Sequence, residues 1–459
     1  MREGHKDIYV ARAPGRLDVM GGAAELGGGT VCQWPLEAGA AVAVQRRDDR
    51  KLVITRYEPG RPAEARDRVA VSLDDFYGSA ALMPREALQK MFAGEKHWAA
   101  HVAGAFPALA KHKKITRRTP GANIACYCDL PRDNDVLGTS GALACATLFA
   151  LAAAHHLILE PLEIAILAHR LEGQTAGMAG GYAEPMTAVF GKKNCLLQMK
   201  SQPHELTGYA PPPKGCAFAA VSIARTDAGD DEAALRRMRG SVGMAQAMIT
   251  RTYRDFGGRK DPSGGYLANV PAGLFERYFR KILPEAIGGE AFVRDFGEAA
   301  EKLHLRDGET YHPRAAAEYQ VEENARSRRI FELLGAGAPT EAAVSAGRIM
   351  LDALAAQGEM ARQFGAGRAA MEAEVWRELI MGTQRGVAKG LYGVRGAGPW
   401  PGGAVAVLME DTDSARQALE AVARDFQVRT GREAEVLIGS SSGAAETAAM
   451  RLEASELAG

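Results

Sequence analysis

The sequence contains few cysteines and no cysteine pair at metal-binding spacing. Its 459 residues include six cysteines, at positions 32, 126, 128, 145, 195 and 216, and none of them forms a C-x-x-C motif. This absence argues against a zinc finger and against a thioredoxin-like redox motif. Scattered thiols are typical of a reducing compartment, so we expect a cytoplasmic location.

Long apolar runs and clustered charge are also lacking. No stretch reaches the roughly 18–20 apolar residues of a membrane-spanning helix, and MREGHKDIYVARAPGR at the start has no apolar segment of the kind found in signal peptides. Lysine plus arginine and aspartate plus glutamate number 56 each, without a basic stripe or polybasic run. We therefore expect neither a nucleic-acid nor a membrane partner. No charge pattern predicts an oligomeric state.

Common catalytic motifs are missing as well. The sequence has no GxxxxGK[ST] phosphate loop and no GxGxxG between a predicted strand and a predicted helix. One G-x-S-x-G pattern, centred on Ser441 in EVLIGSSSGAAETAAM, lies between a predicted strand and a predicted helix. A hydrolase triad of that type needs a histidine after the serine, and the last histidine is His312. The order of residues therefore argues against an esterase.

The length and the pattern predict two domains of mixed helix and strand. A chain of 459 residues is too long for one ordinary core. The proline-rich segment SQPHELTGYAPPPKG suggests a seam, which divides the chain into domains 1–205 and 206–459. The last ninety residues predict the order strand, strand, helix, strand, so we expect an α+β fold.

Three glycine-rich turns, each next to a predicted strand, are the candidates for chemistry. They are APGRLDVMGGAAELGGG at 13–29, the turn before LGTSGALACATLFALAAAHH at 137–156, and GVRGAGPWPGG at 393–403. Glycine lets backbone N–H groups approach an anion, and the start of a helix favours phosphate. The alternative interpretation is three ordinary turns, with Thr139-Ser140 as a plain N-cap.

These segments, together with WAAHVAG at 98–104, LEGQTAGMAGGYAEPMTAVFG at 171–191 and IGSSSGA at 438–444, carry a resemblance that covers nearly the whole chain. The sequence resembles the GHMP family of small-molecule kinases, in particular its L-arabinokinase and galactokinase branch. The resemblance implies an N-terminal S5-like domain with the phosphate loop, a C-terminal ferredoxin-like domain, and a site in the cleft between them. It also implies phosphorylation of a monosaccharide, at the anomeric hydroxyl, with ATP and Mg²⁺.

The resemblance implies roles for particular residues. Glu184 falls at the position of the catalytic base, and Arg16 is placed to pair with the transferred phosphoryl group or with that acid. The alternative for Arg16 is a surface ion pair. The sugar-binding positions implied by the resemblance are occupied by Glu25, Gly22 and Arg225. The nucleotide-binding residues implied are Leu137, Gly138, Thr139, Ser140, Gly141 and Trp98, and the Mg²⁺ ligands implied are Ser140 and Asp135.

Several of these positions depart from the pattern of the branch. Glu184-Pro185 stands where relatives have aspartate and glutamine, and Glu25 stands where they have aspartate. Gly22-Ala23 replaces an acid and a histidine. A glutamate is one methylene longer than an aspartate, and a misplacement of about 1 Å costs about 10²-fold in rate.

The two phosphate-facing turns depart from the pattern too. Asp133 and Asp135 replace glycines in the second turn, and a carboxylate about 4 Å from a phosphate charge costs about 4 kcal/mol at an effective dielectric constant near 20. Either they point to solvent or Mg²⁺ lies between them and the phosphates. Trp400 in the third turn fills space or stacks on a base.

Together, these departures lead to the second function hypothesis, which is a weak or inactive homologue that binds sugar or nucleotide as a sensor or structural partner.

Overall fold

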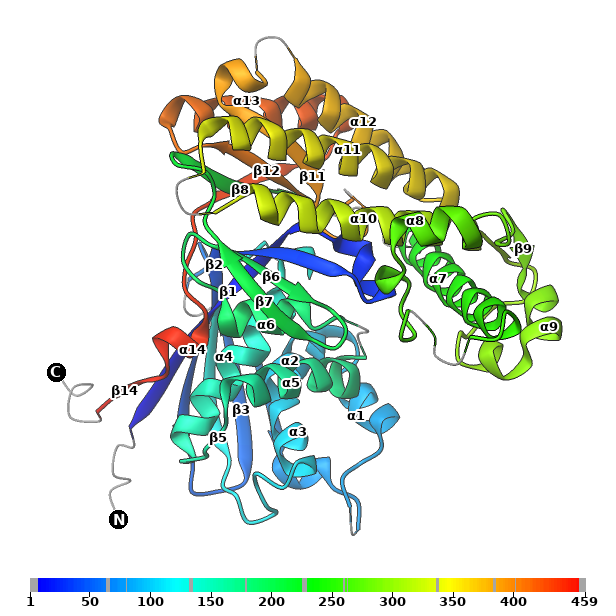
Figure 1. Ribbon diagram of the computed structural model, residues 1–459. Helices are drawn as coiled ribbons and strands as arrows, with labels where there is room; N and C mark the ends of the chain where they lie inside the picture. The colour runs from blue at the N-terminus through cyan, green and yellow to red at the C-terminus, as the bar shows by residue number, and fades with distance from the viewer. Residues whose placement is uncertain are drawn as a thin grey trace. The chain divides into compact units, whose positions relative to one another are not determined.

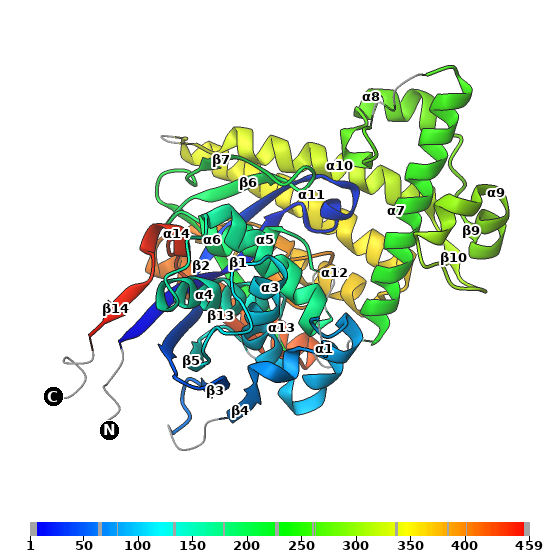
Figure 2. The ribbon, with the colours of Figure 1, turned by 90° about the horizontal axis from the view of Figure 1, so that it is seen from below.

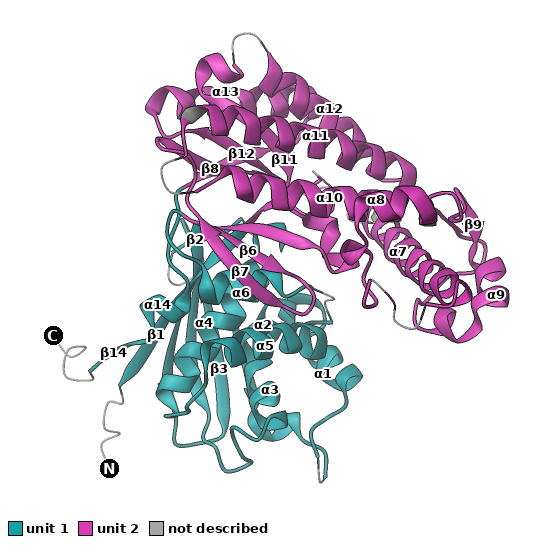
Figure 3. Cartoon of the chain, in the orientation of Figure 1, with its two compact units in different colours: residues 1–16, 35–194, 439–459 teal, residues 17–34, 195–438 magenta. Residues whose placement is uncertain are grey.

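The computed structural model confirms the predicted α+β class (Figure 1). The chain forms two compact units (Figure 3): unit 1 contains 1–16, 35–194 and 439–459, and unit 2 contains 17–34 and 195–438. The predicted seam includes strand β7 of unit 2, and the division into consecutive domains 1–205 and 206–459 stays a prediction. The residues described are 7–62, 67–79, 81–131, 135–177, 180–224, 229–258, 261, 263–335, 338–382, 385–400 and 402–453.

Unit 1 is built on a sheet whose strands follow the order β14-β1-β2-β5-β3-β4. Strands β3 and β5 pair in parallel, while β2 pairs with β5 and β3 with β4 in antiparallel register. Strands β1 and β2 contribute residues to both units. The bounds are β1 Ile8–Met20, β2 Thr30–Arg46, β3 Lys51–Tyr57, β4 Asp67–Ser72, β5 Ala122–Cys128 and β14 Met450–Leu452.

The helices of unit 1 surround α4, which begins at the second glycine-rich turn. Most residues of α4 are buried, since its sequence is apolar on every side, and such a helix is stable only in a core. The helices are α1 Arg85–Met91, α2 Ala100–Ala103, α3 Ala105–Lys111, α4 Thr139–Ala154, α5 Pro161–Leu171, α6 Ala183–Phe190 and α14 Ala444–Thr447, with short turns η2 Leu73–Phe76, η3 Gly94–Ala99, η4 Asp135–Leu137 and η5 Glu172–Ala176.

Unit 2 contains a four-stranded antiparallel sheet in the order β11-β12-β8-β13. Apolar side chains of this sheet pack against α11, α12 and α13 in one core. Thr412 caps the start of α13 by accepting from Ala415 N, and Gly431 ends it in the left-handed conformation. The predicted strand, strand, helix, strand order near the end of the chain is confirmed by β11 Leu391–Gly396, β12 Ala404–Glu410, α13 Asp413–Thr430 and β13 Ala434–Ile438.

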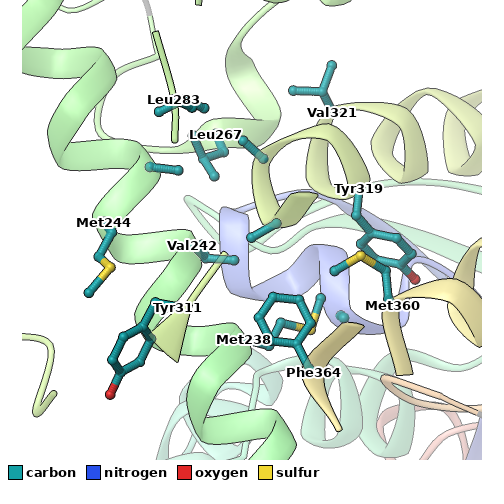
Figure 4. Close-up of a cluster of buried hydrophobic side chains, with 14 of the residues drawn as sticks. Met238, Val242, Met244, Leu267, Leu283, Tyr311, Tyr319, Val321, Met360 and Phe364 are labelled. Atoms are coloured by element: carbon teal, nitrogen blue, oxygen red, sulfur yellow. The ribbon is translucent and has the colours of Figure 1, made fainter. Parts of the chain in front are cut away.

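A second, helical core of unit 2 joins α7, α10 and α11 (Figure 4). Met238 and Val242 of α7, Tyr319 of α10 and Phe364 of α11 meet there, and short strands β9 and β10 lie beside α9 (Figure 2). The other elements of unit 2 are η1 Gly22–Gly27, β6 Leu196–Lys200, β7 Glu205–Ala210, β8 Cys216–Ile223, α7 Gly229–Asp255, η6 Leu267–Asn269, α8 Ala272–Leu274, η7 Phe275–Phe279, β9 Ile287–Gly288, α9 Gly289–Glu301, β10 Thr310–Tyr311, α10 Pro313–Leu333, α11 Thr340–Phe364, α12 Gly367–Met381 and η8 Val387–Lys389.

The environment of Trp400 decides between its two interpretations. Its side chain is buried and belongs to the helical core of unit 2, which contains residues of α7, α10 and α11. Trp400 therefore fills space in that core. Within the described ranges, no helix is apolar over a length that could cross a bilayer.

Candidate active site

Unit 1 brings together Arg16, Ser140 and Glu184, which come from three distant segments. Arg16 Nη2 lies 3.2 Å from Glu184 Oε1, and Ser140 Oγ donates to Glu184 Oε2 at 3.1 Å. Only 14% of the Arg16 side chain and 13% of the Glu184 side chain are exposed, so this is not a surface ion pair. The carboxylate is held at both oxygens, which fixes its orientation.

The close approach of these elements depends on two glycines. Gly138 adopts the left-handed conformation, and a Cβ there would lie 2.7 Å from Arg16 Cγ. A Cβ on Gly141 would lie 2.9 Å from Glu184 Cβ. Pro185 lies in the first turn of α6, where its missing N–H costs no helical hydrogen bond. The Glu-Pro sequence is thus compatible with the helix that carries Glu184.

The start of α4 differs from the plain N-cap interpretation. Gly138 is the N-cap, and no side chain caps this helix. Ser140 directs its hydroxyl at Glu184, and among the described residues Thr139 Oγ1 has no hydrogen-bond partner although it is buried. Leu137, the last residue of η4, is fully buried. The plain N-cap interpretation is therefore wrong, because the two hydroxyls are not used to cap the helix.

Asp135 lies at the same helix start. Its Oδ1 accepts from Ser140 N at 3.3 Å, so a carboxylate of the chain itself satisfies one N–H group that a phosphate would use. Asp135 does not point away from the helix, which excludes the solvent-facing alternative for this residue. Asp133, the other acid of the turn, lies outside the described residues.

Glu172 is a site residue that the sequence interpretation missed. It begins η5, a π-helical turn that continues α5, and only 1% of the residue is exposed. Among the described residues Glu172 Oε1 has no hydrogen-bond partner. Such turns are frequent at functional sites. In the sequence the signal was available as a glutamate next to Gly173, at the point where an apolar helical pattern ends.

The electrostatics of the cluster favour neutral carboxyl groups. Burial raises the pKa of Glu184 to about 7, the charge of Arg16 opposes this rise, and Asp135 adds to it. Burial and the neighbouring Glu184 and Asp135 raise the pKa of Glu172 well above its usual range. The cluster therefore has more carboxyl groups than cations, and a bound cation would stabilise the ionised form of these carboxyl groups.

The oxygen ligands suit Mg²⁺ better than a transition metal. In the described part of the chain, no group of three His, Cys, Asp or Glu side chains is arranged to hold a metal ion. Mg²⁺ usually takes one or two carboxylates and completes its shell with water and substrate phosphates. Ser140 Oγ, the unpaired oxygen of Glu172 and Asp135 fit that role.

Trp98 lies in η3 of unit 1, away from the carboxyl cluster in sequence. The guanidinium carbon of Arg56 lies over its ring, 4.7 Å from the centroid. Arg56 thus uses one face of the ring in a cation–π contact.

The first and third glycine-rich turns meet in unit 2. A Cβ on Gly22 would lie 2.2 Å from the carbonyl oxygen of Gly398. A glycine is required at this position because the third turn occupies the space of a side chain. Burial lowers the pKa of Arg239, and the charge of Glu25, in the first turn of η1, opposes this shift. Arg225 lies outside the described residues.

A buried charge cluster fixes these two turns. Arg395 Nη1 lies 3.4 Å from Asp18 Oδ2, and Arg395 Nη2 lies 3.1 Å from Glu323 Oε1. Asp18 accepts from Gly398 N at 3.1 Å, and Glu323 accepts from Gly21 N at 3.3 Å. Each carboxylate thereby holds one glycine-rich turn. The sequence interpretation missed this cluster.

Ser441, the centre of the G-x-S-x-G pattern, has a structural role. Its hydroxyl accepts from Arg12 Nη1 and donates to the carbonyl oxygen of Leu36, both at 2.9 Å. A nucleophile would need a base in place of these partners. The argument against an esterase therefore agrees with the contacts of Ser441.

The raised pKa of Glu172 leads to a prediction on stability. The folded chain holds this proton at pH values where the unfolded chain, with a pKa near 4.5, has released it. The free energy of unfolding should therefore fall as pH rises above about 4.5, by up to about 1.4 kcal/mol per pH unit. Glu172→Gln should reduce that slope, as measured by urea unfolding between pH 5 and pH 8.

A matched control for this measurement is Glu163→Gln. Glu163 lies on α5, the helix that η5 continues, and it is partly exposed and pairs with Lys114. It should retain the slope of the unsubstituted protein. Parallel pH profiles for Glu172→Gln and the unsubstituted protein would show that Glu172 is not the source of the pH dependence.

Comparison with known proteins gives a matching family, a curated relative and similar solved structures. Residues 100–192 match the family described as GHMP kinases N terminal domain. The chain is 25% identical over 495 residues to an L-arabinokinase of Arabidopsis thaliana, which covers 97% of this chain and 47% of the relative. The chain therefore spans about half the length of this curated relative.

Two solved structures share the fold over nearly the whole chain. One is Lactococcus lactis galactokinase in complex with galactose, with a TM-score of 0.65, 15% identity, and coverage of 97% of this chain and 95% of the other. The other is L. major mevalonate kinase in complex with R-mevalonate, with a TM-score of 0.53, 11% identity, and coverage of 94% and 97%. At these identities the similarity establishes the fold.

Proposed function

Because this chain carries the N-terminal domain of the GHMP kinases and shares their fold along its length, we propose that it is an ATP-dependent sugar kinase. The acceptor we propose is the anomeric hydroxyl of a monosaccharide, as in arabinokinases and galactokinases. One observation carries the proposal: Glu184, a buried carboxyl with a pKa near 7, is oriented by Arg16 and Ser140 at the start of α4.

The role we propose for Glu184 is that of general base. A pKa close to the working pH lets the carboxylate accept a proton from a sugar hydroxyl without being protonated most of the time. Arg16 holds one oxygen of Glu184 and lies where it can also meet the negative charge of a transferred phosphoryl group. Positioning and charge neutralisation supply most of the catalysis in phosphoryl transfer.

The nucleotide phosphates are proposed to lie at the start of α4. The donors we propose there are the backbone N–H groups of Thr139 and Gly141, the hydroxyl of Thr139, and Ser140 N once Asp135 releases it. Ser140, Asp135 and Glu172 would hold Mg²⁺, whose chemistry is to neutralise charge on the phosphates.

Glu25, Gly22 and Arg225 remain our proposed sugar-side residues, and Trp98 remains a proposed neighbour of the nucleotide base. The six free thiols support the proposed cytoplasmic location.

The function is tested by measuring ADP release with Mg²⁺–ATP and a panel of pentoses and hexoses that includes L-arabinose and galactose. The expected result is sugar-dependent ADP release with at least one monosaccharide. Mass spectrometry of the product then identifies the hydroxyl that carries the phosphate. No sugar in the panel giving ADP above the sugar-free rate would refute the kinase proposal.

A second candidate function is a weak or inactive homologue that binds sugar or nucleotide as a sensor or structural partner. The contact between Asp135 Oδ1 and Ser140 N favours it, since a carboxylate occupies a position suited to phosphate. Calorimetry with Mg²⁺–ATP and with the same sugars separates the two functions. A sensor binds at least one ligand but releases no ADP.

The carboxylate of Asp135 leads to a prediction on nucleotide affinity. Asp135→Asn keeps an acceptor for Ser140 N and removes the charge that repels phosphate. We expect metal-free ATP to bind about 10- to 100-fold more tightly, since a like charge near 4 Å costs a few kcal/mol before screening. Mg²⁺ should strengthen ATP binding less in this variant, because one of its proposed ligands is lost. Calorimetry in EDTA and in Mg²⁺ measures both effects.

The matched control is Asp74→Asn, an exposed acid of unit 1 that pairs with Arg50. It removes the same charge and should leave both affinities unchanged. Equal ATP affinities for Asp135→Asn and Asp74→Asn, with and without Mg²⁺, would show that Asp135 affects neither phosphate nor metal.

A further inference from the structure

Unit 1 contains a pocket that the proposed function does not use. It has a volume of about 900 Å³ and lies between the segment that precedes α1, the end of α3, the end of α5 and the segment that precedes α6. Pockets for small molecules usually have volumes of about 300–1,000 Å³. The size therefore suits a ligand as large as a sugar phosphate or a mononucleotide.

The charge on the walls of this pocket has one sign. Arg85, Lys111 and Arg170 line it together with His112 and His169, and none of the described residues that line it is acidic. Arg170 Nη1 lies 2.8 Å from His112 Nε2, so the imidazole orients the guanidinium. Burial and the neighbouring Arg170 and Lys111 lower the pKa of His112, which agrees with its acting as acceptor. Three cations without a counter-charge in the lining create a positive potential in the pocket.

The rest of the lining suits a ring. The rings of His169 and Tyr182 lie against each other, with centroids 3.9 Å apart and planes tilted by 34°. Leu82, Met83 and Pro84 supply apolar surface. A ring-containing organic group can pack on such surfaces, whereas an inorganic ion uses the cations alone.

We propose that this pocket is a second ligand site, which binds a small phosphorylated organic anion such as a sugar phosphate or a mononucleotide. The phosphate is held by Arg85, Lys111 and Arg170, and the organic ring packs against the Tyr182 side of the pocket. The proposal does not rest on kinase activity. An occupant would nevertheless contact the two segments that carry the carboxyl cluster, because Gly173 follows Glu172 in η5 and Tyr182 is the N-cap of α6.

The test is calorimetric titration of the full chain, without ATP or Mg²⁺, by glucose 1-phosphate, by AMP and by inorganic phosphate. The expected result is binding of at least one of the two organic phosphates, more tightly than inorganic phosphate and than glucose or adenosine. If glucose 1-phosphate binds more tightly than AMP, the ligand is a sugar phosphate, and if AMP binds more tightly, it is a mononucleotide. Absence of binding for both organic phosphates at millimolar concentration would overturn the proposal.

Charge variants locate the site. Arg85→Glu with Lys111→Glu should weaken binding about 10- to 100-fold, since the change removes two charge-assisted hydrogen bonds to the phosphate and places like charges beside it. The milder pair Arg85→Gln with Lys111→Gln should have an intermediate effect. Arg118→Glu, an exposed cation of unit 1 outside the pocket, is the control and should bind as the unsubstituted protein does. Binding that persists unchanged in both pair variants belongs to another site, such as that of the proposed kinase, and overturns this proposal.

Discussion

Glu184→Gln is expected to lower kcat by about 10²–10⁴-fold, the usual contribution of a general base. The glutamine keeps the size of the side chain and an acceptor for Ser140, so ATP binding should persist. The unsubstituted protein should also show kcat/KM rising with pH through about 7, because the base must lose its proton to act. The variant should lack that rise. Both effects are measured by ADP release with the preferred sugar between pH 5.5 and pH 8.5.

The control for this experiment is Glu163→Gln, which lies on α5 and pairs with Lys114. It should retain the rate and the pH profile of the unsubstituted protein. A Glu184→Gln variant that retains full turnover would remove Glu184 as the base. Loss of rate together with loss of ATP binding would instead assign Glu184 to nucleotide binding.

Arg395→Met is expected to lower the free energy of unfolding by about 3–5 kcal/mol, because it leaves the buried Asp18 without its cation and leaves the buried Glu323 with Arg326 alone. Arg395, Asp18 and Glu323 are all fully buried. Burial disfavours the charge of Arg395, but Asp18 and Glu323 outweigh it and raise the pKa of the guanidinium. The measurement is urea unfolding at pH 7, followed by tryptophan fluorescence, since Trp34, Trp376 and Trp400 lie in unit 2.

Two further variants test the reason for this loss. Arg416→Met removes a partly exposed arginine that pairs with Asp411, and it should cost less than about 1 kcal/mol. Adding Asp18→Asn and Glu323→Gln to Arg395→Met removes the uncompensated charges and should restore part of the stability. A loss below about 1 kcal/mol in Arg395→Met itself would show that the cluster does not stabilise unit 2.

Local patterns in the sequence were sufficient to predict several elements of the fold. The apolar run of α4 and the strand, strand, helix, strand order near the end of the chain could each be read directly, because these elements depend on periodicity and capping within short segments. The family resemblance, which depends on ordered motifs, was also available from the sequence.

The tertiary structure alone decided which side chains meet. Glu172 and Asp18 looked like ordinary polar residues, since nothing near them in the sequence predicts their burial. In the sequence, Gly22 only suggested that a side chain contacting the sugar had been replaced. In the structure, the carbonyl oxygen of Gly398, hundreds of residues away, lies where a larger residue at position 22 would place its Cβ. Burial, pKa shifts and steric exclusion arise from contacts between distant segments, and a periodic pattern in one segment cannot encode them.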